Sequence, residues 1–150
     1  MNELIKMSAT QIRNKLLNKE VKPSELVEIS IERIKEVDPT INAMPTICYD
    51  RAMAHAKKIE NNTTSNDKNY LGGIPISIKD LVPVEGVRTT WGSPIFKDHI
   101  PQKSDFLVER LERNGGIVVG KSNTPEFGAG ANTFNEVFGP SLSPWNTKKT

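Results

Sequence analysis

Residues 104–119 read Ser-Asp-Phe-Leu-Val-Glu-Arg-Leu-Glu-Arg-Asn-Gly-Gly-Ile-Val-Val, and they give the clearest indication of the fold class. Ser104 is a good N-cap for a helix whose inward-facing residues follow at helical spacing: Leu107, Val108 and Leu111. Gly115-Gly116 then stops the helix. Ile117–Val119 are continuously apolar, which is typical of a strand buried on both faces. A helix, a glycine stop and a buried strand together predict half of an α/β unit.

A second strand is predicted earlier in the chain, over residues 74–79. Three isoleucines alternate there with Pro75, Ser77 and Lys79, and a period of two is the pattern of a strand. The alternation places Ser77 and Lys79 on one face and the isoleucines on the other. Lys79 therefore stands at the carboxyl end of a predicted strand, next to Asp80.

Helices are predicted for the N-terminal part of the chain. Ser8 and Gln11 occupy the two positions of a capping box, which favours a helix over about residues 9–18. A second helix starts around Pro23 and is expected to end at Asp38-Pro39, because the residue before a proline disfavours the helical region. A third helix is expected over about residues 50–60.

These elements predict that residues 1–150 are the N-terminal part of a single domain. A helical opening covers about residues 8–60, and a sheet-forming part covers about residues 72–150. The polar stretch at residues 61–69 joins them as a loop. Residues 121–150 have little periodicity and do not resemble the end of a finished domain.

Composition excludes several classes of protein. The chain has 20 basic and 18 acidic residues and a net charge of +2. This small excess does not suggest nucleic acid as a partner, because a nucleic-acid-binding protein usually carries a basic stripe or patch. One cysteine, Cys48, cannot form an internal disulfide. No apolar stretch is long enough to span a membrane and no signal peptide is visible, so a cytoplasmic protein is expected.

Lys79 is the first candidate for chemistry. Ligands of open α/β sheets bind beyond the carboxyl ends of the strands, where this lysine is predicted to lie. A lysine acts as a base only when it is neutral, and burial disfavours its charged form. The alternative is a surface lysine paired with Asp80, because most lysines are exposed. Spacing alone favours that alternative.

Residues 115–122 fit the pattern of a phosphate-binding loop, since Gly115 is followed by Gly120-Lys121-Ser122 at the required spacing. Such a loop needs a strand before its first glycine and a helix after the lysine. Here a helix comes first, and β-branched residues fill the middle. We therefore expect a strand at these positions and not a nucleotide site.

No metal or other cofactor is expected. His55 lies on an exposed-looking helix and His99 in a loop, and neither stands at the spacing of a zinc site. Both are expected to be solvated. Cys48 is expected to be a buried structural thiol and not a nucleophile.

Several short motifs, in order, resemble those of the amidase signature family. Gly73-Ile-Pro-Ile-Ser-Ile-Lys-Asp80 is similar to the family's lysine motif, and Thr89-Thr-Trp-Gly-Ser93 to its Thr-rich turn. Gly120-Lys-Ser-Asn-Thr-Pro-Glu-Phe-Gly128 is similar to a third family segment. Phe138-Gly-Pro140 and Pro144-Trp-Asn146 resemble the stretch that leads into the family's serine-rich core. The resemblance covers essentially all 150 residues.

The resemblance implies a fold and a reaction. The fold would be the N-terminal part of an α/β/α domain with a mixed central sheet. The reaction would be hydrolysis of an amide by a Ser–cis-Ser–Lys triad, in which Lys79 is the catalytic base. Backbone near Phe127–Ala129 would line the substrate pocket, which marks Gly128 as a substrate-binding position. A small-molecule amide is the implied partner.

The resemblance also sets limits. Both family serines would lie beyond Thr150, so the 150 residues alone are expected to be an inactive fragment. Asn123-Thr-Pro-Glu-Phe127 is more similar to the general amidases than to the A subunit of glutamyl-tRNA amidotransferase, which is the alternative and would bring tRNA in as a partner. A non-catalytic remnant that serves as a binding module is a further alternative.

Overall fold

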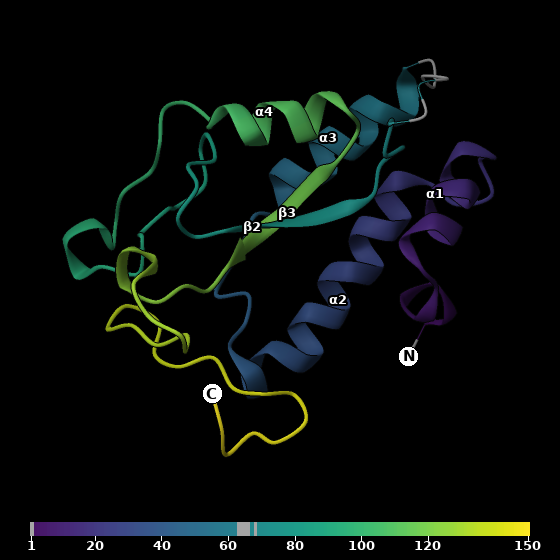
Figure 1. The fold of residues 1–150 in the computed structure, drawn as a ribbon. Coiled ribbons are helices and arrows are strands. Elements are labelled where there is room, and N and C mark those ends of the chain that lie inside the picture. The colour runs from purple at the N-terminus through teal and green to yellow at the C-terminus, as the bar shows by residue number, and fades with distance from the viewer. Residues whose placement is uncertain (1, 63–66, 68) are drawn as a thin grey trace.

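A computed structural model of the protein describes residues 2–62, 67 and 69–150 (Figure 1). The helices are α1 (Ala9–Leu17), α2 (Pro23–Ile41), α3 (Tyr49–Asn61) and α4 (Phe106–Arg113). The strands are β1 (Thr46–Ile47), β2 (Pro75–Lys79) and β3 (Ile117–Ser122), and short 3-10 turns lie at Glu3–Lys6, Pro94–Phe96 and Glu126–Gly128. No helix in the described part of the chain is long and apolar enough to cross a membrane.

The sheet is mixed, as the resemblance implied. Its strand order is β1-β3-β2, with β2 parallel and β1 antiparallel to the central strand β3. The parallel pair ends in register, with Lys79 opposite Ser122. A register shift between Ile76 and Ser77 interrupts the pairing. The two-residue strand β1 was not predicted, because two residues are too few to show a period.

Helices cover both faces of this sheet. On one face, α2 and α3 pack against Ile117 and Val119. On the other face, α4 and the loop after β2 pack against Val118 and Ile78. Successive residues of β3 thus enter different cores, which explains why this strand is apolar without alternation. The α/β fold expected from residues 104–119 is confirmed.

Two helix starts agree with the sequence, and one helix end does not. Ser8 and Gln11 form the expected capping box of α1, and Pro23 is the first residue of α2. However, α2 continues past Pro39 to Ile41. The Asp38 carboxylate accepts hydrogen bonds from the Ala43 and Met44 amides, which stabilises the last turn around the proline. Asn42, with a φ of 50°, ends the helix.

The start of α4 also differs from the prediction. Asp105 is the N-cap, and its carboxylate accepts a hydrogen bond from the Leu107 amide. Ser104 Oγ instead accepts a hydrogen bond from the Glu85 amide. Val108 is fully buried, but Leu107 is 52% exposed, so the expectation that Leu107 points inward was wrong. The cap lies one residue later than expected, and the buried side of the helix is at Val108.

Strand β3 is three residues longer than predicted and includes Gly120, Lys121 and Ser122. The expected strand therefore replaces the phosphate-binding loop that the motif suggested. Gly120 is needed here, because a Cβ at this position would overlap the Thr46 carbonyl oxygen of β1. Most of the loop predicted at residues 61–69 lies outside the described residues.

Candidate active site at the carboxyl ends of two parallel strands

Lys79 lies at the edge of the sheet where β2 and β3 both end. Ser77 and Lys79 are exposed, whereas Ile78 between them is buried, so the faces predicted from the period-two pattern are confirmed. Within the described residues, the Lys79 ammonium has no hydrogen bond or ion pair. The open end of the parallel strands therefore carries an exposed primary amine.

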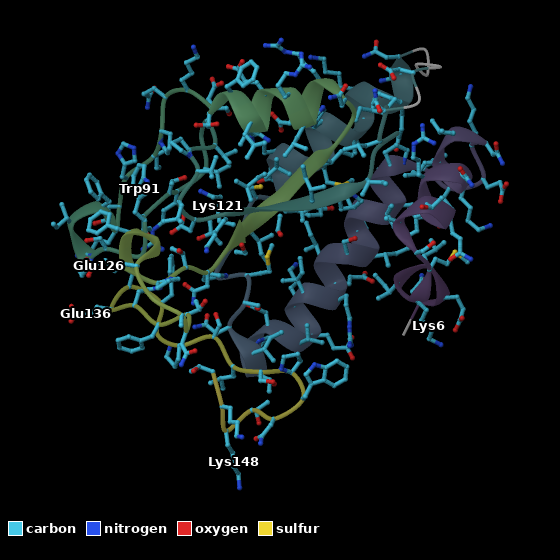
Figure 2. All side chains as sticks on the ribbon, viewed as in Figure 1. Lys6, Trp91, Lys121, Glu126, Glu136 and Lys148 are labelled. Atoms are coloured by element: carbon cyan, nitrogen blue, oxygen red, sulfur yellow. The ribbon has the colours of Figure 1, made fainter. Side chains whose placement is uncertain are left out.

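Asp80 is not the partner of Lys79. Its side chain is buried and lies 3.2 Å from the ammonium of Lys121, which is buried as well. The predicted Lys79–Asp80 surface pair was therefore half right, since Lys79 is exposed but Asp80 pairs elsewhere. Neighbouring residues on a strand point to opposite faces, which directs the carboxylate into the protein. Figure 2 shows Lys121 inside the molecule, whereas Lys6 and Lys148 lie at its periphery.

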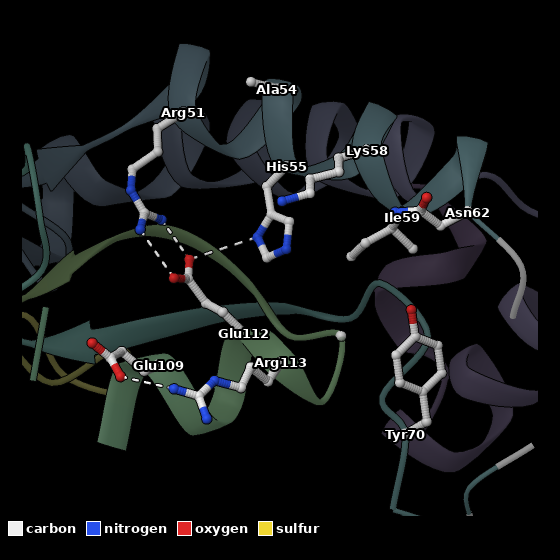
Figure 3. Close-up of a pocket in the computed structure, with 11 residues that line it drawn as sticks. Arg51, Ala54, His55, Lys58, Ile59, Asn62, Tyr70, Glu109, Glu112 and Arg113 are labelled. Carbon is white, nitrogen blue, oxygen red and sulfur yellow. Dashed lines mark hydrogen bonds and ion pairs between the residues drawn. The ribbon is translucent and has the colours of Figure 1, made fainter. Parts of the chain in front are cut away.

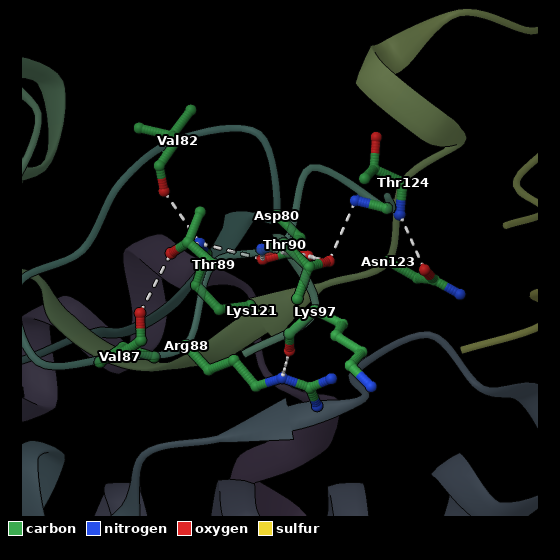
Figure 4. Close-up of polar contacts among 11 residues, drawn as sticks. Asp80, Val82, Val87, Arg88, Thr89, Thr90, Lys97, Lys121, Asn123 and Thr124 are labelled. Atoms are coloured by element: carbon green, nitrogen blue, oxygen red, sulfur yellow. Dashed lines mark hydrogen bonds and ion pairs between the residues drawn. The ribbon is translucent and has the colours of Figure 1, made fainter. Parts of the chain in front are cut away.

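Lys121 reaches three acceptors that come from the loop after β2 (Figure 4). Besides Asp80, its ammonium donates to the Val82 carbonyl oxygen at 2.9 Å and to Thr89 Oγ1 at 2.6 Å. A lysine ammonium has three donors, so this set satisfies it completely. Burial lowers the pKa of Lys121, and the negative charge of Asp80 opposes that shift. In the sequence this lysine is part of the phosphate-loop pattern and of the family-like segment Gly120–Gly128, and neither pattern predicts its pairing with Asp80.

The Thr-rich turn closes around the same carboxylate. Asp80 accepts hydrogen bonds from the Thr90 amide and the Thr90 hydroxyl, and its own carbonyl accepts one from the Trp91 amide. Thr90 Oγ1 in turn accepts from the Gly92 amide at 3.0 Å. The buried pair thus holds both ends of the loop that runs from Asp80 to Gly92.

Gly128, the predicted substrate-binding residue, is exposed and lies in the short turn Glu126–Gly128. The Phe127 amide in this turn donates to the Trp91 carbonyl oxygen at 2.7 Å. Gly128 has a φ of 76°, and a Cβ there would lie 2.9 Å from Leu81 Cδ1. The fold therefore brings the turn that contains Gly128 against the loop that follows Lys79.

Aromatic rings collect on the same loops. Trp91 lies 5.0 Å from Phe96 and 5.4 Å from His99, and Phe96 lies 6.3 Å from Phe127, measured between ring centroids. His99 is exposed as expected, although its ring packs against Trp91 and Phe96. The sequence showed no periodic signal for this cluster, because its members lie in irregular loops.

A second polar network fixes the chain after β3. Asn135 donates to Asn123 Oδ1 at 2.7 Å and to the Thr124 carbonyl oxygen at 2.8 Å. Asn123 in turn donates to Ser141 Oγ at 3.1 Å. Buried amide side chains replace regular structure here, which is why residues 121–150 looked unorganised in the sequence.

A hollow of about 720 Å³ between α3 and α4 does not contain Lys79 (Figure 3). Arg51 donates two hydrogen bonds to Glu112, at 2.5 and 3.0 Å, and His55 Nδ1 lies 3.6 Å from the same carboxylate. The expectation that His55 is solvated was therefore wrong. Desolvation acts to raise the pKa of Glu112, but its interactions with His55 and Arg51 outweigh this and lower it to about 2.

Cys48 is partly buried, and its thiol donates to the Val118 carbonyl oxygen at 3.3 Å. Burial raises the pKa of this thiol, in agreement with the expected structural role. In the residues that the structure describes, no group of three His, Cys, Asp or Glu side chains could hold a metal ion.

Comparison with known proteins gives a consistent family. The family model described as Amidase matches residues 25–150. The A subunit of the glutamyl-tRNA(Gln) amidotransferase of Lawsonia intracellularis is 39% identical over 148 residues, which cover 99% of this chain and 30% of that protein. The chain thus spans less than a third of the length of this relative.

Solved structures agree with the sequence relatives. A bacterial aryl acylamidase of the amidase signature family superposes with a TM-score of 0.83 at 27% identity, covering 94% of this chain and 30% of that one. A chain of a vestigial protein complex, studied for the origins of an s-triazine catabolic enzyme, superposes with a TM-score of 0.86 at 29% identity. That match covers 94% of this chain and 31% of the other.

Proposed function

The chain belongs to the amidase family, and we propose that it contributes Lys79 as the base of a reaction at the carbon–nitrogen bond of an amide. The observation that carries the proposal is the position of Lys79. It is exposed and without a partner among the described residues, at the carboxyl ends of two parallel strands. The Lys121 ammonium, by contrast, is buried against Asp80 and is not available at that edge.

The proposed chemistry is the Ser–cis-Ser–Lys mechanism that the sequence resemblance implies. A neutral Lys79 accepts a proton through the bridging serine, and the nucleophilic serine attacks the amide carbonyl carbon. The carbon–nitrogen bond breaks, ammonia or an amine leaves with a proton, and water then hydrolyses the acyl-enzyme to the acid. Backbone amides stabilise the negative oxygen of the tetrahedral intermediates.

This mechanism needs residues other than these 150, since both serines would come from elsewhere in a protein of the relatives' length. The same additional residues would cover the open strand ends and exclude water from Lys79. Removal from water disfavours the charged form of a lysine, so this covering would make Lys79 a usable base. The 150 residues alone are expected to release no ammonia from amides.

Gly128 is proposed to contact the substrate through its backbone. Its turn is exposed and lies against Leu81, two residues after Lys79. A glycine at a φ of 76° leaves the peptide groups of the turn accessible, because no side chain covers them.

The test is Lys79→Ala in the natural gene product that contains this chain. Ammonia release from benzamide and from glutamine should fall about 100- to 10,000-fold, the usual contribution of a general base. The free energy of unfolding, measured with urea, should change by no more than about 0.5 kcal/mol, because the side chain is exposed. Lys57→Ala is the matched control, because Lys57 is also an exposed lysine but lies on α3. Wild-type turnover in Lys79→Ala would remove this lysine from the mechanism.

A second candidate is an amidotransferase that modifies glutamyl-tRNA(Gln). The 39% identity to the Lawsonia protein favours it. Asn123–Phe127, by contrast, is more similar to the general amidases. Glutamine, glutamyl-tRNA(Gln) and ATP supplied together distinguish the two. An amidotransferase would transfer ammonia to the glutamyl carboxylate, which ATP activates, and form glutaminyl-tRNA, whereas a general amidase would release ammonia from a simple amide alone.

A further inference from the structure

The loop Asp80–Gly92 and the turn Glu126–Gly128 carry or adjoin both proposed site residues, yet neither contains a regular helix or strand of more than three residues. Their shape must therefore be fixed by side chains. The buried ammonium of Lys121 is the one point where Asp80, Val82 and Thr89 of this loop are held together in the part of the chain described.

We infer that Lys121 is the positioning residue of the site, which sets the loop Asp80–Gly92 and, through it, the turn that carries Gly128 relative to Lys79. This inference rests on the proposed function for its catalytic meaning. The geometry itself connects the parts: Lys121 binds Thr89 and Asp80, and Asp80 binds Thr90 and Trp91. Trp91 then accepts the hydrogen bond from Phe127.

A lysine is suited to this role by its number of donors. Three acceptors of different kinds converge on one point, namely a carboxylate, a carbonyl and a hydroxyl. Asparagine or glutamine could donate only two hydrogen bonds, and methionine none. Buried ion pairs contribute little net stability, because the cost of desolvation offsets their attraction. What the pair provides is therefore a defined position for the loop.

Thr89→Val tests the inference with little change in packing, because valine has the same shape as threonine but lacks the hydroxyl that accepts the hydrogen bond from Lys121. Thr89→Val is compared with Thr89→Ser, which keeps the hydroxyl, in the natural gene product. Hydrogen exchange at the Trp91, Phe127 and Gly128 amides should rise roughly tenfold in Thr89→Val, while exchange in α2 stays unchanged. Thr89→Ser should exchange at the wild-type rate.

The same variants give a catalytic readout. In Thr89→Val, kcat for benzamide should fall roughly tenfold while KM changes less than about twofold, because the loop loses its position and not its binding groups. Thr89→Ser should restore kcat. Val119→Ala, on the same strand but in the other core, destabilises the fold and should leave exchange at Trp91 and Phe127 unchanged relative to α1, which packs in a separate cluster.

Lys121→Met is the stronger variant, expected to raise exchange at the same three amides, but it leaves the Asp80 charge buried and unpaired and can prevent folding. In that event the Thr89 pair decides. Equal exchange at Trp91, Phe127 and Gly128 in Thr89→Val and Thr89→Ser would overturn the inference. Hydrogen exchange is measured without substrate and does not depend on catalysis. Failure of the proposed function would instead appear as wild-type turnover in Lys79→Ala, so the two failures can be distinguished.

Discussion

Among single residues, two lysines at the ends of neighbouring strands have opposite environments. Lys79 is exposed and has no partner among the described residues, whereas Lys121 is fully buried and bound by three acceptors. The register shift between Ile76 and Ser77 changes which residues of β2 and β3 lie opposite each other. Lys121, and not the neighbouring Lys79, is the partner of Asp80.

Gly120 provides a prediction about a single residue. A Cβ at this position would overlap the Thr46 carbonyl oxygen, and a backbone atom cannot move away as a side chain can. Gly120→Ala should therefore separate β1 from β3 and lower the free energy of unfolding by about 1–3 kcal/mol, as overpacking does. Urea unfolding measures this.

Ser122→Ala is the matched control for Gly120→Ala, since it changes a partly buried residue two positions further along β3. It should change stability by less than about 0.5 kcal/mol. A Gly120→Ala protein as stable as this control would show that β1 does not pack as closely against β3 as described.

Among the secondary-structure elements, the contacts between α3 and α4 join the two helical layers. Arg51 on α3 binds Glu112 on α4 through two hydrogen bonds, and the helices belong to opposite faces of the sheet. The side chains are only 28% and 18% exposed, so this pair is better shielded than the exposed Arg33–Glu36 pair. A two-bond arginine–carboxylate pair with this burial is expected to stabilise the fold.

This pair predicts how stability depends on pH. The pKa of Glu112 is about 2 in the folded protein and near its ordinary value of 4.5 in the unfolded chain. The unfolded chain therefore takes up a proton first as pH falls, so the stabilisation is complete above pH 4.5 and is lost as pH approaches 2. The shift corresponds to about 3 kcal/mol.

Urea unfolding at pH 6 and pH 3 tests the contribution of Glu112. Wild-type protein should lose more stability between these values than Glu112→Gln, which cannot titrate. Glu36→Gln removes a carboxylate from an exposed ion pair, which solvent screens, and should retain most of the wild-type pH dependence. An identical loss of stability in wild type and Glu112→Gln would exclude Glu112 as the titrating group.

Across the molecule as a whole, the sheet and the loops around Lys79 present surfaces suited to further contacts. In the described residues β2 pairs only with β3, so its other edge has no neighbour. Large apolar side chains are exposed on the loops nearby: Ile95, Phe96, Ile100, Phe127 and Phe134. An unpaired strand edge beside exposed apolar groups promotes association between copies.

The 150 residues expressed alone are therefore expected to aggregate or to unfold without a cooperative transition. Light scattering and thermal unfolding followed by circular dichroism measure this. Ser77→Lys, which adds a charge to the edge strand, should reduce association, whereas Thr147→Lys in the exposed tail should not. A monomeric chain with a cooperative transition would contradict this expectation.

The local elements could be predicted from groups that are close together in the chain. The capping box of α1, the start of α2 at Pro23, and the strand character of residues 117–119 all follow from hydrogen-bonding groups and periodicity within a few residues. The same local pattern placed Lys79 on the polar face at the end of β2. The α/β class and the family resemblance were visible for the same reason.

The partner of each buried charged side chain, by contrast, depends on packing between distant segments. The partner of Asp80 is Lys121, far away in the chain, and His55 lies beside Glu112 of another helix. The end of α2 beyond Pro39 likewise depends on the Asp38 side chain, which binds amides that follow the helix. Periodicity shows which face of an element is apolar, but it does not show which groups from distant segments meet. Those contacts depend on how the strands and loops pack, and they determine that Lys121 is buried and paired whereas Lys79 is exposed.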